Sequence, residues 1–272
     1  MSNAAPPLVD FVITKEFRLF SEFCEAVRRY KYIGVCYGPP GVGKTLSARR
    51  VAQWSILERL LPFGPAEHFP EELDPRECHT LLYTPQVSHT PRKIYTEMTK
   101  LHQHLNYLIA GVLHVRGEEV FPNGLPANHI NLLIVDEVDW LKAPALEQLR
   151  GIADKEQIGM VFIGMPGLQK RLSRYPQLYS RVGHVHQFNP LQTDEVKSLL
   201  AKQWNYWGLS LQAEDFTDTE AVATMIHLTG GNFRLLNRLC TEIERVLRVN
   251  KMHLVTKEVV ETASQDLVYG EE

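Results

Sequence analysis

Residues 38–45 of the chain read Gly38-Pro39-Pro40-Gly41-Val42-Gly43-Lys44-Thr45. This stretch has the G-x-x-x-x-G-K-S/T spacing of a phosphate-binding loop. An apolar run at residues 32–37 predicts a buried strand before the loop, and residues 45–61 have the apolar spacing of a helix. A glycine-rich turn between a strand and a helix points backbone N–H groups at a phosphate, and the helix N-terminus adds partial positive charge. The stretch therefore predicts a nucleoside triphosphate site in an α/β fold.

The polar residues of this loop have distinct expected roles. Lys44 is expected to reach the β- and γ-phosphates, and the Thr45 hydroxyl is expected to hold Mg²⁺. ATP and Mg²⁺ are therefore the expected cofactors. The nucleotide is expected to rest on the whole segment, which comprises Gly38, Pro39, Pro40, Gly41, Val42, Gly43, Lys44, Thr45 and Leu46. The alternative, a structural glycine-rich turn with an unrelated lysine, is disfavoured by the strand and helix around it.

A second apolar run ends in two carboxylates, in the sequence Leu132-Leu133-Ile134-Val135-Asp136-Glu137. Asp136 is placed to hold the Mg²⁺ shell, as in other phosphate-loop enzymes. Glu137 is placed to orient and deprotonate an attacking water molecule. The alternative is an acidic strand end that faces solvent, and the phosphate loop upstream makes that interpretation the weaker one. The pair therefore adds hydrolysis to nucleotide binding.

Length and composition bound the class of protein. The 272 residues, 44% of them apolar, suit one large or two modest domains. The formal charge of −3 argues against a wholly basic coat for nucleic acid but permits a local basic surface. The four scattered cysteines are expected to be core residues in a reducing compartment. No apolar run has the length of a membrane span and the start lacks a signal pattern, so we expect a cytoplasmic protein without a membrane partner.

The order of predicted elements indicates two domains. Predicted strands lie at residues 32–37, 78–84, 131–135 and 159–164. They alternate with predicted helices at 15–30, 45–61, from 90 onwards and at 144–153, and with loops at 62–76 and 117–129. Such alternation predicts a parallel sheet flanked by helices, in a nucleotide-binding domain at residues 1–189. Only helices are predicted beyond, at 193–207, 216–228, 232–250 and 256–267, so residues 190–272 are expected to form a small helical domain.

Together the phosphate loop and the acidic strand end resemble those of the AAA+ ATPases. That resemblance implies a P-loop NTPase fold in which the C-terminal helical domain is a lid. Residues 229–238 resemble the sensor-2 region of such lids, and Arg234 is at the position that touches the γ-phosphate. The alternative is an ordinary helix start with a solvated arginine. Gly230-Gly231 supplies a flexible break before this helix in either case.

The resemblance also implies an arginine finger, which reaches into the ATP site of a neighbouring subunit. The family places it in a segment that corresponds here to residues 169–188, which contain Arg171, Arg174 and Arg181. Arg181, in the sequence Leu178-Tyr179-Ser180-Arg181-Val182, fits the pattern best, and Arg174 is the second candidate. An arginine supplied in trans is a large electrostatic term in phosphoryl transfer. A plain surface charge is the alternative for each.

One position departs from the family pattern. The strand at residues 159–164 should be followed by a polar sensor-1 residue, and here the equivalent position is Met165. A thioether cannot position water as an amide or a hydroxyl does. This departure favours a slow, switch-like ATPase.

Within the AAA+ proteins, the chain most resembles the transposition ATPases of the TniB, phage Mu B and TnsC type. The shared features include residues 134–139, residues 162–166 and the arginine at position 234. The resemblance implies a bacterial regulator of DNA transposition that assembles on duplex DNA as a ring or helical filament. It further implies recruitment or stimulation of a DDE transposase, with a target-selection protein as a further candidate partner.

DNA binding of this kind needs cations near phosphates. The candidates are Arg92, Lys93 and Lys100, at the start of the helix that begins near residue 90. A solvated helix face is the alternative for each of them. A second, weaker candidate is the basic and aromatic run at residues 28–32. Contacts would go to the DNA backbone without sequence specificity, and the histidine pairs at 102 and 104 and at 184 and 186 are not expected to bind a metal.

Two other functions remain open from the sequence. One is a generic AAA+ loader or motor in replication or secretion, in which case hydrolysis should be fast and DNA-stimulated. The other is a nucleotide-gated adaptor that contacts only protein, in which case binding to DNA and its steep salt dependence should be missing.

Overall fold

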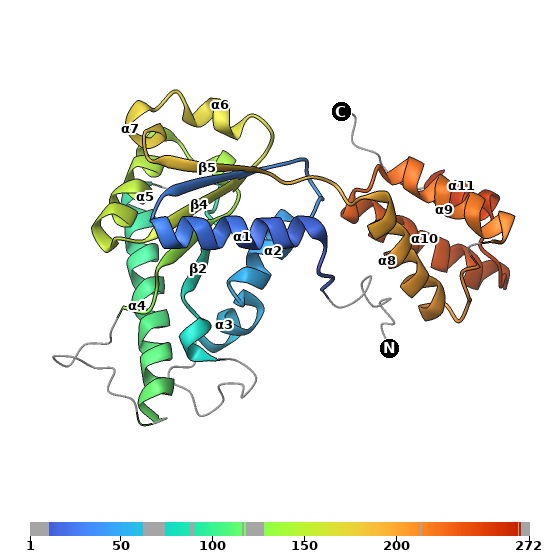
Figure 1. The fold of residues 1–272 in the computed structure, drawn as a ribbon, viewed down its shortest axis with the longest axis horizontal. Helices are drawn as coiled ribbons and strands as arrows, with labels where there is room; N and C mark the ends of the chain where they lie inside the picture. The colour runs from blue at the N-terminus through green and yellow to red at the C-terminus, as the bar shows by residue number, and fades with distance from the viewer. Residues whose placement is uncertain are drawn as a thin grey trace. The chain divides into compact units, whose positions relative to one another are not determined.

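The computed structural model describes residues 11–61, 74–87, 90–115, 117, 128–212, 214–265 and 267. Contacts divide the chain into two compact units. The larger unit comprises Leu19–Gly38 and Lys44–Phe188, and it contains the sheet (Figure 1). The smaller unit comprises Met1–Arg18, Pro39–Gly43 and Asn189–Glu272, and it contains the C-terminal helices.

The larger unit is built on a five-stranded parallel sheet with the strand order β2-β3-β4-β1-β5. The strands are β1 (Ile33–Tyr37), β2 (Thr80–Tyr83), β3 (Leu132–Val135), β4 (Gly159–Gly164) and β5 (Val182–Gln187). The side chains of β2, β3 and β4 are buried throughout, as their uninterrupted apolar sequences predict for strands of a parallel sheet. The expected α/β fold with a parallel sheet is confirmed.

The fifth strand was absent from the sequence prediction. β5 lies at the edge of the sheet beside β1, and most of its side chains are exposed. Its sequence, Val-Gly-His-Val-His-Gln, therefore lacks the continuous apolar character that identified the four other strands.

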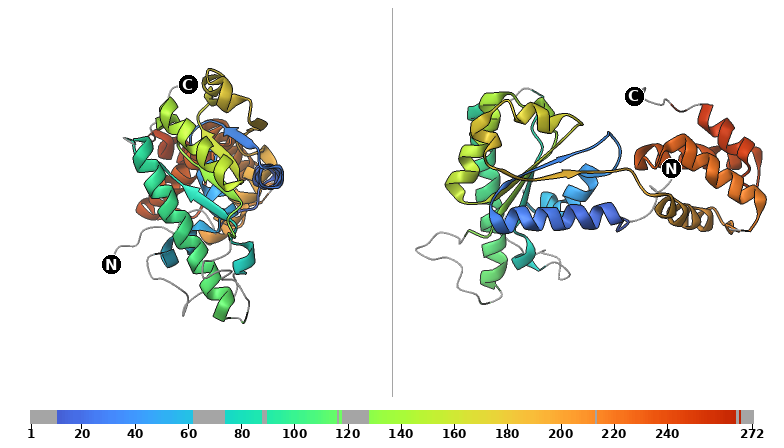
Figure 2. Two further views of the ribbon diagram at one scale, coloured as in Figure 1. Left: turned by 90° about the vertical axis from the view of Figure 1, so that its left-hand side faces the viewer. Right: turned by 45° about the horizontal axis from the view of Figure 1, so that its top comes forward.

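Helices surround the sheet in the larger unit. They are α1 (Lys15–Tyr30), α2 (Lys44–Val51), α3 (Trp54–Leu60), α4 (Pro91–Val115), α5 (Ala143–Glu156), α6 (Leu168–Leu172) and α7 (Pro176–Tyr179). The described residues of this unit also form two 3₁₀ turns, η2 (Pro75–Glu77) and η4 (Val138–Trp140). Figure 2 shows α4 and α5 side by side. The predicted loops at 62–76 and 117–129 lie mainly outside the described residues.

The single helix predicted at residues 45–61 was wrong, because the structure has two. α2 ends at Val51 and α3 begins at Trp54. Between them Gln53 has a φ of 51° and a ψ of 29°, a left-handed conformation that ends one helix and redirects the next. The break was not visible in the sequence because no glycine or proline marks it.

α1 packs against the sheet at two glycines. Its buried side includes Phe20, Phe23 and Val27. A Cβ on Gly34 of β1 would lie 2.6 Å from side-chain atoms of both Phe23 and Val27. A Cβ on Gly159 of β4 would lie 2.5 Å from the Val27 carbonyl oxygen. The absence of side chains at these two positions therefore lets the helix approach the strands closely.

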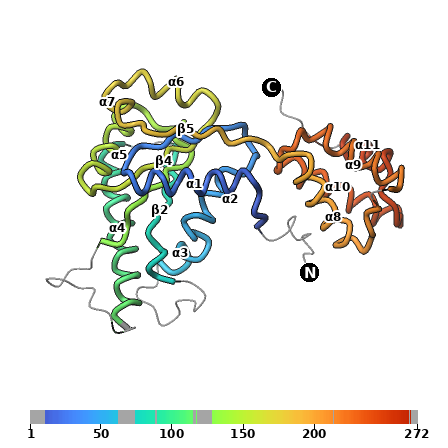
Figure 3. The backbone as a smooth tube through the Cα atoms, in the orientation of Figure 1, coloured from blue at the N-terminus to red at the C-terminus, as the bar shows by residue number. Residues whose placement is uncertain are grey.

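The smaller unit is a helical cluster, traced in Figure 3. Its helices are α8 (Thr193–Tyr206), α9 (Phe216–Thr229), α10 (Phe233–Asn250) and α11 (Lys257–Gln265), which confirms the helices predicted after residue 190. Trp204 is buried among them, and its indole Nε1 donates to Asp218 Oδ1 at 3.3 Å. Asp218 Oδ2 accepts from the Gln212 N–H at 2.8 Å, so this buried carboxylate is fully hydrogen-bonded.

All four cysteines are buried and none forms a disulfide. In the described residues, we find no helix with the combined length and apolarity that a membrane span requires.

Replacing Gly159 with alanine should destabilise the larger unit. The new methyl group would collide with backbone atoms of α1, which cannot rotate away, so we expect a loss of about 1–3 kcal/mol in unfolding free energy. Gly151 of α5 is the matched control, since a Cβ there meets nothing within 4 Å. Gly151→Ala should stabilise the helix by about 0.5–1 kcal/mol. Denaturant unfolding measures both, and equal stability of the two variants would contradict the close packing of α1.

Candidate functional site

The phosphate loop between β1 and α2 adopts a conformation that needs its glycines. Gly41 and Gly43 have φ values of 83° and 111°, which L-residues with side chains rarely adopt. A Cβ on Gly38 would lie 2.2 Å from the Phe188 carbonyl oxygen. Each glycine of the motif is therefore required by the backbone, and a loop of this kind presents N–H groups to an anion at the start of α2. The loop fits a nucleotide phosphate.

Lys44 folds back across the loop. Its Nζ donates to the Gly38 carbonyl at 2.6 Å. Burial lowers the pKa of Lys44, and the nearby Cys36 and the carboxylates of Asp136 and Glu137 act in the opposite direction. The ammonium group thus lies at the first residue of the loop, and the charges of both predicted acidic residues act on it.

Thr45 and Asp136 meet although they are 91 positions apart in the sequence. The Thr45 hydroxyl donates to Asp136 Oδ2 at 2.6 Å. Asp136 is only 3% exposed, and its N–H extends the sheet by donating to the Tyr83 carbonyl at 2.9 Å. A hydroxyl and a carboxylate are the oxygen ligands that Mg²⁺ takes beside nucleotide phosphates. The two residues predicted to hold the metal therefore lie together and fit it.

Glu137 lies directly after Asp136 in an unusual backbone conformation. Its φ of 51° and ψ of 41° are left-handed. Its N–H donates to Asp136 Oδ1 at 2.9 Å, and its side chain is partly buried. Non-glycine residues in this region are uncommon and cluster at functional sites.

Two residues hold the turn after Glu137, a role that sequence reasoning did not assign to either of them. Asp139 Oδ2 accepts a hydrogen bond of 2.7 Å from the Met165 N–H. Arg171 donates to backbone carbonyls of the same turn, with distances of 2.7, 2.9 and 3.3 Å. Arg171 is therefore engaged within its own subunit and is no longer an arginine-finger candidate. An acidic residue three positions after Asp136 was the only signal in the sequence for this arrangement.

The two other arginines of this segment are exposed. The Arg181 side chain is 59% exposed and lies 3.6 Å from Asp154 Oδ2, while Asp154 also accepts from Arg150 at 2.7 Å. A contact this exposed holds a side chain only weakly. A hollow of about 610 Å³, lined in part by Tyr30 and Lys31, adjoins Arg181. Arg181 and Arg174 both remain predicted fingers.

Met165 follows β4, with 39% of its surface exposed. Its backbone N–H is already used in the hydrogen bond to Asp139. The side chain itself presents only a thioether.

In the smaller unit, the start of α10 contacts the centre of the phosphate loop, which belongs to the same unit. Asn232 caps α10 by accepting from the N–H groups of Arg234 and Leu235, at 3.1 and 3.3 Å. The Asn232 side-chain amide also donates to the Pro40 carbonyl at 2.8 Å, and the Arg234 N–H donates to the Gly41 carbonyl at 3.0 Å. Sequence reasoning missed Asn232, and the contacts of Arg234 are made by its backbone N–H, so the role of its side chain at the γ-phosphate stays a prediction.

The predicted DNA cations lie along the first turns of α4. Arg92, Lys93 and Lys100 are all exposed. Lys93 and Lys100 are seven positions apart and share one side of the helix, whereas Arg92 lies about 100° around it from Lys93. Lys93 is partly engaged, because its Nζ lies 2.9 Å from Gln86 Oε1 and 3.7 Å from Glu97 Oε1. All three cations are therefore exposed, but they do not all lie on the same side of α4.

The second basic candidate, residues 28–32, is also at the surface. Tyr30 and Tyr32 are 54% and 44% exposed, and their rings stack at a centroid distance of 5.7 Å. Arg29 lies over the Tyr30 ring at 5.8 Å.

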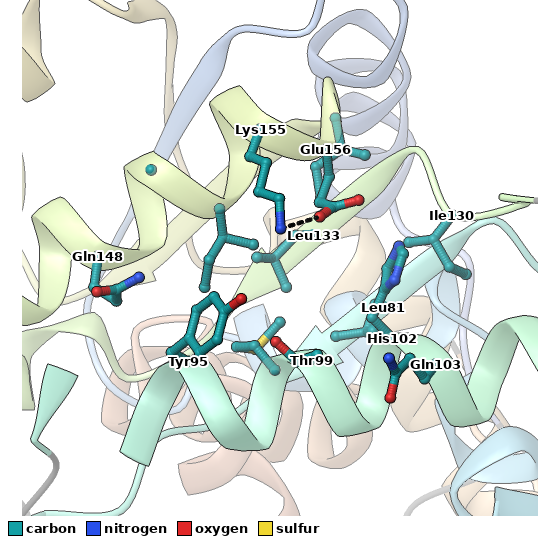
Figure 4. Close-up of a pocket in the computed structure, with 14 residues that line it drawn as sticks. Leu81, Tyr95, Thr99, His102, Gln103, Ile130, Leu133, Gln148, Lys155 and Glu156 are labelled. Carbon is teal, nitrogen blue, oxygen red and sulfur yellow. Dashed lines mark ion pairs between the residues drawn. The ribbon is translucent and has the colours of Figure 1, made fainter. Parts of the chain in front are cut away.

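A separate hollow of about 390 Å³ lies between α4 and α5 (Figure 4). Tyr95 and His102 line it from α4, and an ion pair of 3.8 Å between Lys155 and Glu156 lies on the α5 side. Burial lowers the pKa of His102. No residue of the phosphate loop or the acidic strand end lines this hollow within the described chain. The described residues also contain no cluster of three or more histidine, cysteine or acidic side chains suited to a metal.

The contact between Asn232 and the loop can be separated from helix capping. Asn232→Ala removes a cap and should cost about 0.5–2 kcal/mol of stability. Asp215 caps α9 in the same way, by accepting from the Thr217 and Asp218 N–H groups, but it makes no contact with the loop. Asp215→Ala should therefore cost as much stability while leaving nucleotide affinity unchanged, whereas Asn232→Ala should alter it. Equal nucleotide affinity in both variants would contradict a role for Asn232 at the loop.

Comparisons with known proteins agree with this geometry. A family model described as AAA domain matches residues 27–172. A potential ATP-binding protein of Staphylococcus aureus is 41% identical over 270 residues, covering 96% of this chain and 97% of that protein. The Mu-like prophage FluMu DNA transposition protein B of Haemophilus influenzae is 26% identical over 243 residues, covering 86% of this chain and 71% of that protein.

Solved structures share the fold. The RuvB Holliday junction branch migration motor of Thermotoga maritima superposes with a TM-score of 0.57 at 17% identity, over 94% of this chain and 70% of that one. The ORC1 protein of Aeropyrum pernix, solved in complex with DNA, has a TM-score of 0.55 at 17% identity, over 95% of this chain and 66% of that one. The fold is therefore the AAA+ P-loop fold, as the sequence predicted. Because the AAA domain model spans residues 27–172 of 272 and the Staphylococcus relative matches almost the whole length, the chain belongs to the AAA domain family.

Proposed function

We propose that the protein is an ATP-dependent, DNA-binding regulator of transposition. It oligomerises on target DNA, and slow ATP hydrolysis controls its disassembly. In the assembled form it recruits or stimulates a DDE transposase, with a target-selection protein as a further partner. The observation that carries this proposal is the 26% identity to a DNA transposition protein B over 86% of the chain. The AAA+ fold and the paired Thr45 and Asp136 support the ATP-dependent part.

The residues of the predicted nucleotide site have separate roles in the proposed hydrolysis. The phosphate loop and Lys44 hold the phosphates, and Thr45 with Asp136 holds Mg²⁺. Bound Mg²⁺ supplies charge neutralisation at the phosphate oxygens. Glu137 orients the attacking water and accepts its proton. Met165 offers no polar side chain to assist it, which supports slow turnover.

The other part of the site comes from a second subunit. Arg181 is our preferred arginine finger, because it is exposed and held only by a weak ion pair, and Arg174 is the second candidate. Arg234, in the helical domain at residues 190–272, reports the state of the γ-phosphate. Hydrolysis then requires that two subunits be docked, and release of phosphate weakens the assembly.

The arginine assignment is tested by mixing two inactive variants. Glu137→Gln should abolish turnover by removing the general base, which contributes roughly 10²- to 10⁴-fold, and Arg181→Ala should abolish it by removing the finger. In a mixture, an Arg181→Ala subunit with an intact Glu137 can receive Arg181 from a Glu137→Gln neighbour. Random pairing in a cyclic or helical assembly should restore up to about a quarter of the wild-type rate.

Phosphate release measures the recovery. Mixing Glu137→Gln with Arg174→Ala is the matched test of the second candidate. No recovery in either mixture would contradict an arginine supplied in trans by this segment. Rapid, DNA-stimulated turnover by the wild-type protein would instead support a loader or motor.

DNA binding through α4 predicts a change in salt dependence. The affinity of a protein that neutralises phosphates falls linearly on a log–log plot against salt, by about one unit of slope per contact. A triple alanine variant of Arg92, Lys93 and Lys100 should therefore lower the slope by about three. The matched control replaces three other exposed cationic residues, Lys155, Lys170 and Lys202.

Filter binding of a duplex of mixed sequence across salt concentrations gives both slopes. An unchanged slope in the α4 variant would remove α4 from the DNA surface. A wild-type protein without measurable DNA affinity would support the protein-only adaptor.

A further inference from the structure

The turn after Glu137 is fixed by two neighbouring segments that lie outside the nucleotide-binding motifs. This turn, η4, comprises Val138–Trp140 and leads into Leu141. Asp139 attaches it to the residue after β4, and Arg171 attaches it to α6. We call Asp139 and Arg171 the turn clamp.

Arg171 meets the turn at its carbonyl end. One guanidinium nitrogen, Nη1, donates to the Asp139 carbonyl at 2.7 Å, and Nη2 donates to the Val138 and Leu141 carbonyls at 2.9 and 3.3 Å. Carbonyls at the end of a helical turn can lack partners within it, although the Val138 carbonyl also accepts the Leu141 N–H at 2.9 Å. A planar guanidinium can bridge several of them, whereas the ammonium of a lysine does not offer the same rigid fork.

Asp139 belongs to the turn itself and attaches it to the residue that follows β4. Its Oδ2 accepts from the Met165 N–H at 2.7 Å. A Cβ on Gly164 would lie only 2.4 Å from this oxygen, so the carboxylate occupies the space that a side chain there would need. Gly164 is the last residue of β4 and is paired with Tyr37, the residue before the phosphate loop. The clamp therefore fixes the turn relative to the strand that leads into the loop.

Glu137 depends on this support because its own backbone is strained. Glu137 is one of five described non-glycine residues with a left-handed φ, a conformation that contacts with the surrounding structure help to hold. Before it, the Asp136 carboxylate accepts the Glu137 N–H at 2.9 Å. After it, the Glu137 carbonyl accepts from the Trp140 N–H at 3.2 Å, inside the turn that the clamp holds. The backbone of Glu137, from which its side chain projects, is thus held on both sides.

We propose that Arg171 and Asp139 are positioning residues that aim the Glu137 carboxylate at the water that attacks ATP. This inference rests on the proposed function, since it presumes that Glu137 activates water. Neither residue belongs to the phosphate loop or to the Thr45 and Asp136 pair: Arg171 bonds only backbone carbonyls in the described contacts, and Asp139 bonds a backbone N–H. Loss of the clamp should therefore affect the rate of the chemical step and spare nucleotide binding.

The test compares Arg171→Lys and Asp139→Ala with Lys170→Met, which replaces the exposed neighbour of Arg171 on α6. Both clamp variants should lower kcat by about tenfold or more, because a displacement of about 1 Å in a catalytic group can cost about 100-fold. The affinity for a fluorescent ATP analogue should stay within about twofold of wild type. Arg171→Lys should retain more activity than Arg171→Ala, and Lys170→Met should match wild type.

Amide hydrogen exchange gives a readout that needs no turnover. Exchange at residues 137–141 should be faster in Arg171→Lys than in Lys170→Met, and the Met165 amide should lose protection in Asp139→Ala. Wild-type kcat in both clamp variants, or unchanged exchange at residues 137–141, would overturn the proposal. A parallel fall in kcat and nucleotide affinity would also overturn it, since that result indicates a general structural role. If the wild-type protein does not hydrolyse ATP, the proposed function fails, and the exchange measurement still decides whether the clamp fixes the turn.

Discussion

The hydrogen bond from the Thr45 hydroxyl to the buried Asp136 carboxylate is the contact on which the site depends. It joins the first residues of α2 to the end of β3, and its length of 2.6 Å sets the distance between the two predicted Mg²⁺ ligands. The parallel sheet makes it possible, because the carboxyl ends of β1 and β3 open at the same edge with β4 between them. Burial of Asp136, at 3% exposure, makes its pairing obligatory, because an unpaired buried carboxylate is costly. The loop conformation, the strand order and the acidic pair are therefore one connected arrangement.

A good deal of this arrangement could be predicted from sequence, because it is encoded in short motifs with local physical meaning. Spacing alone located the phosphate loop, the acidic strand end and the helices after residue 190. The missed features depend on tertiary contacts. The edge strand β5 has a polar sequence because most of its side chains face outward. The helix break at Gln53 has no glycine or proline to mark it. Asp139, Arg171 and Asn232 act through backbone groups far away in the sequence, and no spacing rule identifies such partners.

Side-chain contacts distinguish the arginine-finger candidates, which the sequence alone placed in one segment. Arg171 is committed to the turn after Glu137, and Arg181 is exposed beside a hollow with a weak partner. A guanidinium that makes several bonds to its own subunit cannot serve a neighbour, whereas an exposed one with a single weak ion pair can. Met165 contributes its backbone to the turn and no polar side chain to the site. These features fit the proposed slow ATPase. Its rate is limited because Met165 offers no polar side chain, and its site is completed by a second subunit.

The central claim is that ATP, DNA and self-assembly are linked, and electron microscopy of the assembled protein tests it most directly. Purified wild-type protein is mixed with duplex DNA and either a slowly hydrolysed ATP analogue or ADP. We expect rings or helical filaments on DNA with the analogue and their loss with ADP, because only the triphosphate can be contacted by an arginine from the next subunit. Monomers under all of these conditions, with nucleotide shown to be bound, would contradict the account.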